Sequence, residues 1–209
     1  MNLVVFGATG PSGRELLKQA LDQGHRVTAS ARNPEKLTFQ HDRLNIIKGD
    51  ILDPASVEAA IAGADVVLSV LGVRKLGKNT ILSDGTGNII AAMQRRGVRR
   101  FICESSLGVG DSRGQMSWLF EKIILPSLLR NAFADKEIQE RTIMQSEVDW
   151  TIVRPAMLTN GPRTGVYRAW VGKPKEAIRG KISRADVADF MLKQLNSPEF
   201  VKRAVGLSH

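Results

Sequence analysis

Three glycines near the amino terminus, Gly7, Gly10 and Gly13, have a spacing suited to binding phosphate groups. They follow the apolar run Leu3–Phe6, which predicts a buried strand, and they open a segment with helical periodicity. In such a turn one glycine permits a tight backbone geometry, a second lets the chain approach a pyrophosphate, and a third lets helix and strand pack closely. The pattern predicts a dinucleotide-binding turn, and the alternative is a strand-to-helix turn without a ligand.

Hydroxyl groups and backbone amides at the same turn add hydrogen-bond donors. Thr9 and Ser12 stand among the glycines. The first turn of the following helix leaves its amides unpaired and carries a partial positive charge. Both features favour an anionic ligand.

The end of the second expected strand selects between the two nicotinamide cofactors. A carboxylate there would bind the ribose hydroxyl of NAD, whereas a guanidinium would pair with the extra phosphate of NADP. Arg32 occupies this position in "SARNPEK", with Ser30 and Lys36 close in sequence and no acid before Glu35. We therefore expect NADP(H), the alternative being a solvated loop arginine.

The ends of the third and fourth strands are expected to line the same crevice. Asp50 and Ile51 follow the third strand and would lie at the adenine end, although Asp50 could equally cap the next helix. Val70, Leu71 and Gly72 follow the fourth strand, where their backbone could line the path of the pyrophosphate and the nicotinamide ribose.

Short β-branched runs alternate with helical periodicity over the first two-thirds of the chain, which is typical of a parallel sheet built from βαβ units. The expected class is α/β, a Rossmann-like doubly wound parallel sheet in one domain spanning residues 1–209. The expected strands are residues 2–6, 25–31, 44–49, 65–70, 99–105 and 149–155, and the expected helices are residues 13–23, 54–62, 81–96 and 118–145.

The pattern loosens after the sixth strand. Residues 157–182 are rich in Gly, Pro and basic residues, so we expect an irregular segment on the substrate side of the sheet. A terminal core helix follows, with Ser183 as its N-cap. The apolar stretch Trp118–Leu129, interrupted by Pro126, could be core, lid or partner surface.

Composition argues against several classes of protein. Cys103 is the only cysteine, which predicts no intrachain disulfide, and the three scattered histidines suggest no metal site. The net charge of +9 raises the question of nucleic acid, but the densest basic run, Gln94–Arg100, lies where basic residues complement a helix C-terminus, so nucleic acid is not an expected partner. Without an apolar span or a signal peptide, we expect a cytoplasmic protein with no membrane partner.

Taken with the glycine spacing and Arg32, the later motifs "GDILD", "VLG", "ICESS" and "ISRADVADFMLKQL" resemble the atypical short-chain dehydrogenases/reductases with NAD(P)-binding, NmrA-like folds. The likeness runs nearly end to end and is nearest to the NADPH-dependent flavin reductase and biliverdin reductase B branch. It implies a phosphate-binding turn that includes Pro11, a serine near the nicotinamide at Ser105, and a segment passing the carboxamide that begins at Pro155.

The chain departs from this family where an acid or base would stand. Typical members carry a tyrosine four residues before a lysine, so that the lysine lowers the pKa of the phenol. Here Ala132 precedes Lys136 by four, and the only tyrosine is Tyr167, far downstream. Met157 stands about where the flavin reductase branch can carry a histidine. The usual alcohol dehydrogenase or epimerase mechanism is not expected.

Hydride transfer to a conjugated ring needs mainly close stacking, so a strong protein acid is optional. We therefore expect an NADPH-dependent reductase of a flavin, quinone or similar acceptor, with Ser105, Ser106 and Lys136 as catalytic candidates. The serines could instead bond their own backbone in a turn, and Lys136 could be an exposed helix position. The alternative function is an NADP(H)-sensing regulator of the NmrA type, and either protein would be a monomer or a homodimer.

Overall fold

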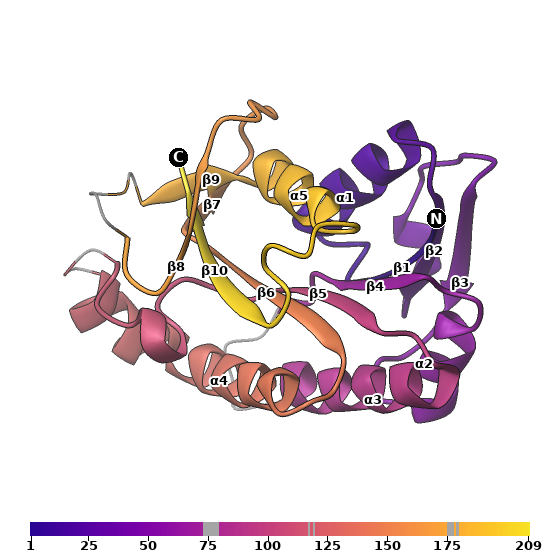
Figure 1. Cartoon of the computed structure of the whole chain (residues 1–209), viewed down its shortest axis with the longest axis horizontal. Coiled ribbons are helices and arrows are strands. Elements are labelled where there is room, and N and C mark those ends of the chain that lie inside the picture. The colour runs from indigo at the N-terminus through magenta and orange to yellow at the C-terminus, as the bar shows by residue number, and fades with distance from the viewer. Residues whose placement is uncertain (73–79, 117, 119, 175–177, 179) are drawn as a thin grey trace.

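Helices cover both faces of a central sheet in the computed structural model, which describes the whole chain except residues 73–79, 117, 119, 175–177 and 179 (Figure 1). The helices α1 and α5 lie on one face, and α2, α3 and α4 lie on the other. The bounds are α1 (Pro11–Asp22), α2 (Pro54–Ile61), α3 (Ile81–Arg96), α4 (Arg130–Met144) and α5 (Arg184–Lys193).

The sheet has eight strands in the order β3-β2-β1-β4-β5-β6-β10-β8, and only the β8–β10 pair is antiparallel. The strand order reverses between β1 and β4, which is the switch point where doubly wound sheets bind ligands beyond the carboxyl ends of their strands. The bounds are β1 (Asn2–Phe6), β2 (Arg26–Ala31), β3 (Leu44–Lys48), β4 (Val66–Ser69), β5 (Arg100–Glu104), β6 (Asp149–Pro155), β8 (Arg168–Val171) and β10 (Arg203–Ser208).

Alternate residues of each central strand enter two separate hydrophobic clusters, because successive side chains point to opposite faces of a sheet. In β1, Leu3 and Val5 pack with α1 and α5, whereas Val4 and Phe6 pack with α2 and α3. Burial on both faces explains why the parallel strands are continuous apolar runs in the sequence. The expected single α/β domain with a Rossmann-like sheet is confirmed.

The region after β6 is more regular than we expected. Two short strands, β7 (Met157–Thr159) and β9 (Lys181–Ser183), pair in a small separate sheet, and β8 extends the main sheet. Ser183 caps α5 as expected, with its hydroxyl accepting a hydrogen bond from the Asp186 amide at 3.0 Å. However, α5 is not the terminal element, because β10 follows it and inserts between β6 and β8.

The expected long helix 118–145 is two elements. A π-helical segment, η3 (Phe120–Leu129), precedes α4, and two short 3₁₀ turns, η1 (Pro34–Lys36) and η2 (Gly110–Ser112), lie elsewhere. Pro126 has no amide hydrogen to donate to an α-helical ladder, which accounts for an irregular first half. Trp118 and Ile123 are exposed, so the described part of this segment is not simply core.

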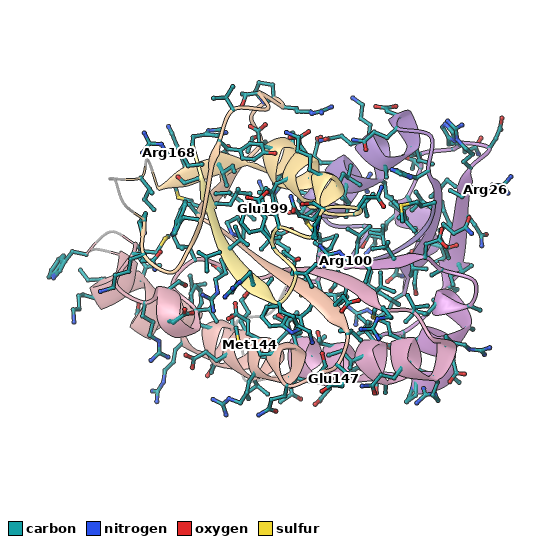
Figure 2. The ribbon with its side chains drawn as sticks, viewed as in Figure 1. Arg26, Arg100, Met144, Glu147, Arg168 and Glu199 are labelled. Atoms are coloured by element: carbon teal, nitrogen blue, oxygen red, sulfur yellow. The ribbon has the colours of Figure 1, made fainter. Side chains whose placement is uncertain are left out.

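Three arginines illustrate the different positions of basic residues in the fold. Arg26 and Arg168 project from opposite ends of the molecule, whereas Arg100 lies near its centre (Figure 2). Arg100 donates to the Gln194 and Asp149 carbonyls and to the Thr151 hydroxyl, so this arginine of the basic run has a structural role. No helix within the described ranges has the length and apolar character needed to cross a bilayer.

Candidate functional site

A cleft of about 880 Å³ lies at the carboxyl ends of the central strands and continues past α4 and α5. It is lined by residues from nine segments that are separate in sequence, and parallel pairing brings five of them, at the ends of β1 to β5, to one edge of the sheet. The sequence-predicted residues that line it are Gly7, Thr9, Gly10, Pro11, Ser12, Arg32, Ile51, Val70, Leu71, Gly72, Ser105, Ser106 and Lys136.

The three glycines of the first turn have different surroundings. Gly7 has φ +89°, and a Cβ there would lie 2.5 Å from the Val70 carbonyl oxygen. A Cβ on Gly13 would lie 2.3 Å from the Gly7 carbonyl oxygen, so this glycine lets α1 approach the turn. Gly10 lines the cleft, and its nearest neighbour to a built Cβ is 3.3 Å away. Gly7 therefore permits the tight turn, Gly13 permits the close packing of α1, and Gly10 leaves the cleft open to a ligand.

The start of α1 leaves backbone donors at the cleft. Gly10 is the N-cap and provides no side-chain cap, and Pro11 has no amide hydrogen. The helical ladder starts with the Arg14 amide, which donates to the Gly10 carbonyl at 3.0 Å, so the amides of Ser12 and Gly13 precede it. These donors and the positive end of the helix dipole suit a diphosphate group.

The ends of β2 and β3 form the opposite end of the cleft. Arg32 and Lys36 are exposed and line it together with Ser30, and Arg32 forms no ion pair with any residue in the described ranges. Ile51 also lines the cleft, and its side chain packs where a Cβ on Gly85 would stand, 2.5 Å from Cγ1. These two exposed cations suit an additional phosphate group.

Asp50 is not brought into the cleft. Its carboxylate accepts a hydrogen bond from the Leu52 amide at 3.0 Å, which closes a local turn. It does not cap α2 either, because that role belongs to Asp53, whose carboxylate accepts from the Ala55 amide. The adenine contact expected of Asp50 stays a prediction.

The end of β5 provides the floor of the cleft beside α1. Ser105 is 4% exposed, and its Oγ has no hydrogen-bond partner among the described residues. Ser106 donates from its hydroxyl to the Leu107 carbonyl at 3.1 Å, which is the turn-forming role that we considered as its alternative. Among the described residues, the Ser105 hydroxyl therefore has no hydrogen bond within the protein, whereas the Ser106 hydroxyl has one.

Glu104, directly before these serines, is a cleft residue that the sequence did not reveal. Its Oε1 accepts a hydrogen bond from the Ser12 hydroxyl at 3.3 Å, so the end of β5 contacts the phosphate-binding turn. Burial raises the pKa of this carboxyl, although Lys136, Ser12 and Arg184 act in the opposite direction. A carboxyl at the end of a buried strand, next to a candidate serine, is the signal that could have identified it.

Lys136 is held at the cleft by the packing of α4 on α3. The neighbouring Asp135 is buried and accepts hydrogen bonds from the Leu82 and Ser83 amides at 2.9 and 3.1 Å, at the start of α3. Lys136 itself is partly buried and lines the cleft. Ala132, one turn earlier, is buried.

A buried ion pair ties the elements around Ser105 together. Arg154 of β6 donates to Glu140 of α4 at 2.6 Å, and both side chains are almost fully buried. Arg154 also pairs with Asp111 in the loop after β5. Pro155 does not line the cleft; its carbonyl accepts from the Leu107 amide, so it fixes that same loop.

Tyr167 and Cys103, whose side chains can be reactive in other settings, do not line the cleft. Tyr167 lines a separate cavity of about 400 Å³, and its hydroxyl donates to Asp189 at 2.6 Å. Burial and this bond raise the pKa of Tyr167 to about 12. Cys103 is fully buried in β5, and burial raises the pKa of its thiol to about 12, so it is a core residue.

Known proteins are similar to this chain in sequence and in fold. The chain is 31% identical to an uncharacterized chloroplastic protein of Arabidopsis thaliana, over 93% of this chain and 72% of that protein. It superposes on a short-chain dehydrogenase/reductase of Veillonella parvula solved in complex with NADP, with a TM-score of 0.82, 21% identity, and coverage of 100% and 94% of the two chains. The expected cytoplasmic location stays a prediction.

A second solved structure is the anaerobilin reductase ChuY of Escherichia coli O157:H7, with a TM-score of 0.82, 25% identity, and coverage of 100% and 97%. The model of a family described as NAD(P)H-binding matches residues 7–198, which include the glycine turn, Arg32 and the end of β5. This chain therefore belongs to the NAD(P)H-binding family, which confirms the expected nicotinamide dinucleotide as its ligand.

Proposed function

We propose that this protein is an NADPH-dependent reductase of a flavin, quinone or similar conjugated acceptor, in the flavin reductase and biliverdin reductase B branch of the NmrA-like reductases. One observation carries the proposal: a single cleft joins the glycine turn to Ser105, Ser106 and Lys136. A dinucleotide bound along it would have its phosphates at α1 and its reactive end near these polar groups. The likeness to ChuY, which is described as an anaerobilin reductase, supports a reductase function.

The choice of NADPH over NADH rests on the cations at the end of β2. Arg32 and Lys36 line the cleft where the adenine ribose binds in doubly wound folds. A guanidinium can hold the 2′-phosphate with two parallel hydrogen bonds, and Lys36 adds a second positive charge. Among the described residues that line the cleft, the only carboxyl is Glu104, at the other side of the glycine turn.

The residues at the reactive end are suited to orienting an acceptor rather than to strong acid catalysis. Bound NADPH supplies the hydride. Ser105 has a free hydroxyl that can hydrogen-bond the acceptor or the carboxamide, and Lys136 can attract an anionic substituent of the acceptor. No tyrosine stands among the described residues that line the cleft, so stacking and orientation carry most of the rate enhancement.

The proposal is tested by following NADPH absorbance with purified protein and a panel of flavins, quinones and linear tetrapyrroles. We expect oxidation above the rate without protein for at least one acceptor, and a Ser105→Ala variant that is slower with that acceptor. Absence of turnover with every conjugated acceptor would contradict a reductase function.

A cleft without a catalytic tyrosine among its described lining residues also fits a second function, that of an NADP(H)-sensing regulator. Such a protein would bind the dinucleotide without oxidising it and would associate with another protein in only one redox state of the cofactor. Affinity capture with NADPH or NADP⁺ present distinguishes the two functions. A partner retained in one state, together with no turnover, would favour the regulator.

A further inference from the structure

Glu104 is the buried carboxyl that contacts the phosphate-binding turn. Its side chain is 8% exposed, Oε1 accepts from the Ser12 hydroxyl at 3.3 Å, and Oε2 is buried with no hydrogen-bond partner among the described residues. A carboxylate that lacks a partner on one oxygen is costly to bury, whereas a protonated carboxyl can donate a hydrogen bond. The unpartnered oxygen is the observation that points to a hydrogen bond with a bound ligand.

Several charged and titratable groups face Glu104 from the elements around it. Lys136 on α4 and Arg184 at the start of α5 provide the cations, and both line the same cleft. Arg184 also donates to Asn160 at 2.6 Å, so part of its hydrogen-bonding capacity is used. Other polar side chains near it are Ser12 from α1, and Cys103 and Ser105 from β5.

These cations do not offset the cost of burial. The pKa of Glu104 is raised in the free protein because burial outweighs Lys136, Ser12 and Arg184 together. A diphosphate at the turn would add negative charge beside Ser12, which disfavours the ionised carboxyl further. The phosphates would also compete with Glu104 for the positive charges of Lys136 and Arg184.

We propose that Glu104 binds the dinucleotide in its protonated form, donating a hydrogen bond from its carboxyl group, so that NADPH binding takes up a proton from solvent. This role requires only that the dinucleotide binds at the glycine turn, so it holds whether or not the protein turns NADPH over. Glu104 is therefore a cofactor-binding residue, and the affinity for NADPH falls as the pH rises above the pKa of the free carboxyl.

Calorimetric titration of NADPH in buffers with different ionisation enthalpies measures the proton uptake directly. The 2′-phosphate of NADPH also titrates, near pH 6 by analogy with other phosphate esters, so the reference is the Glu104→Gln variant, which shares that contribution. We expect wild type to take up more protons than Glu104→Gln, by a difference that peaks between the free and bound pKa values. Between those two pKa values, its affinity should fall by up to about tenfold per pH unit relative to the variant.

The matched control is Glu199→Gln, which removes an exposed carboxylate on the loop between α5 and β10 (Figure 2). It should behave as wild type. Equal proton uptake by wild type and Glu104→Gln would overturn the proposal. A measurement that needs no variant is the infrared difference spectrum of the wild-type protein on adding NADPH above the pKa of the free carboxyl. There we expect a gain in the band of a protonated carboxyl, and the lack of a gain would also overturn it.

Discussion

Alanine substitutions at Gly10 and Gly13 should separate the two functions assigned to the glycine turn. At Gly13 the new Cβ would lie 2.3 Å from the Gly7 carbonyl oxygen and 2.6 Å from the Ala8 Cα, and neither backbone atom can rotate away. At Gly10 the backbone has φ −77° and ψ 166°, which alanine adopts readily, and the nearest atom lies 3.3 Å away. We therefore expect Gly13→Ala to destabilise the fold and Gly10→Ala to weaken binding.

The magnitudes follow from these contacts. Relieving the Gly13→Ala overlap requires α1 to move away from the turn, and overpacking of this kind costs about 3 kcal/mol, which lowers Tm by roughly 6–12 °C in a chain of this size. Gly10→Ala should change the free energy of unfolding by less than about 1 kcal/mol. Its methyl group enters the path of the diphosphate, so the Kd for NADPH should rise about tenfold or more, equivalent to about 1.4 kcal/mol.

Thermal unfolding followed by circular dichroism gives the stabilities, and calorimetric titration gives the Kd for NADPH. Wild-type affinity in Gly10→Ala would refute the assignment of Gly10 as the point of phosphate approach. A Gly13→Ala protein as stable as wild type would refute the assignment of Gly13 to close packing.

Three further predictions address the cofactor, the thiol and the acid stability. Arg32→Glu should raise the Kd for NADPH by roughly 10–100-fold and that for NADH only a few-fold, since a charge-assisted bond to phosphate contributes about 1.5–3 kcal/mol; equal changes in titrations of both cofactors would contradict this. Cys103, with a thiol pKa of about 12, should resist alkylation at pH 8 in the native protein and react once unfolded; mass spectrometry showing equal rates would contradict its burial.

The acid prediction concerns Asp186, which hydrogen bonds from His209, Gly165, Ser183 and Thr164 hold at a pKa of about 2 although burial alone would raise it. A lowered pKa means that the folded state favours the carboxylate, so this stabilisation is present above about pH 4 and is lost as the pH falls towards 2. Urea unfolding should show Asp186→Asn less stable than wild type by at least about 2 kcal/mol at pH 7, with a gap that narrows below pH 4; a gap independent of pH would contradict it.

Five of the six strands that the sequence predicts are mainly buried, and burial on both faces produces continuous apolar runs; the exception is β3, whose residues are partly or fully exposed. Four strands of the structure, β7 to β10, were not predicted, and two of them, β8 and β10, pair with each other. A Cβ on Gly206 would lie 2.3 Å from the Trp170 ring, so β10 contains a glycine where β8 packs its tryptophan across the pair. That glycine weakens the local strand signal of β10, and only the tertiary contact explains it.

In the candidate site, too, some residues could be predicted from local sequence patterns and others only from the tertiary structure. Glycine spacing and Arg32 are local features with a known physical purpose: Gly7, Gly10 and Arg32 line the cleft, and Gly13 lets α1 approach the turn. Glu104 and the Arg154–Glu140 pair acquire their importance from burial between β5, β6, α1 and α4, which no local pattern encodes. Asp50 shows the opposite case, because its position in the sequence favoured the crevice but its carboxylate closes a turn.

The central claim is that the cleft holds NADPH as a hydride source, and a single-turnover measurement tests it most directly. Protein saturated with NADPH is mixed with an excess of a flavin or quinone without oxygen, and the loss of nicotinamide absorbance is followed in time. We predict that bound NADPH is oxidised faster than the same concentration of free NADPH, and that Gly10→Ala protein, at the same concentrations, shows a smaller fast phase. Oxidation of bound NADPH at or below the rate of the free cofactor, with every acceptor tried, would contradict the account.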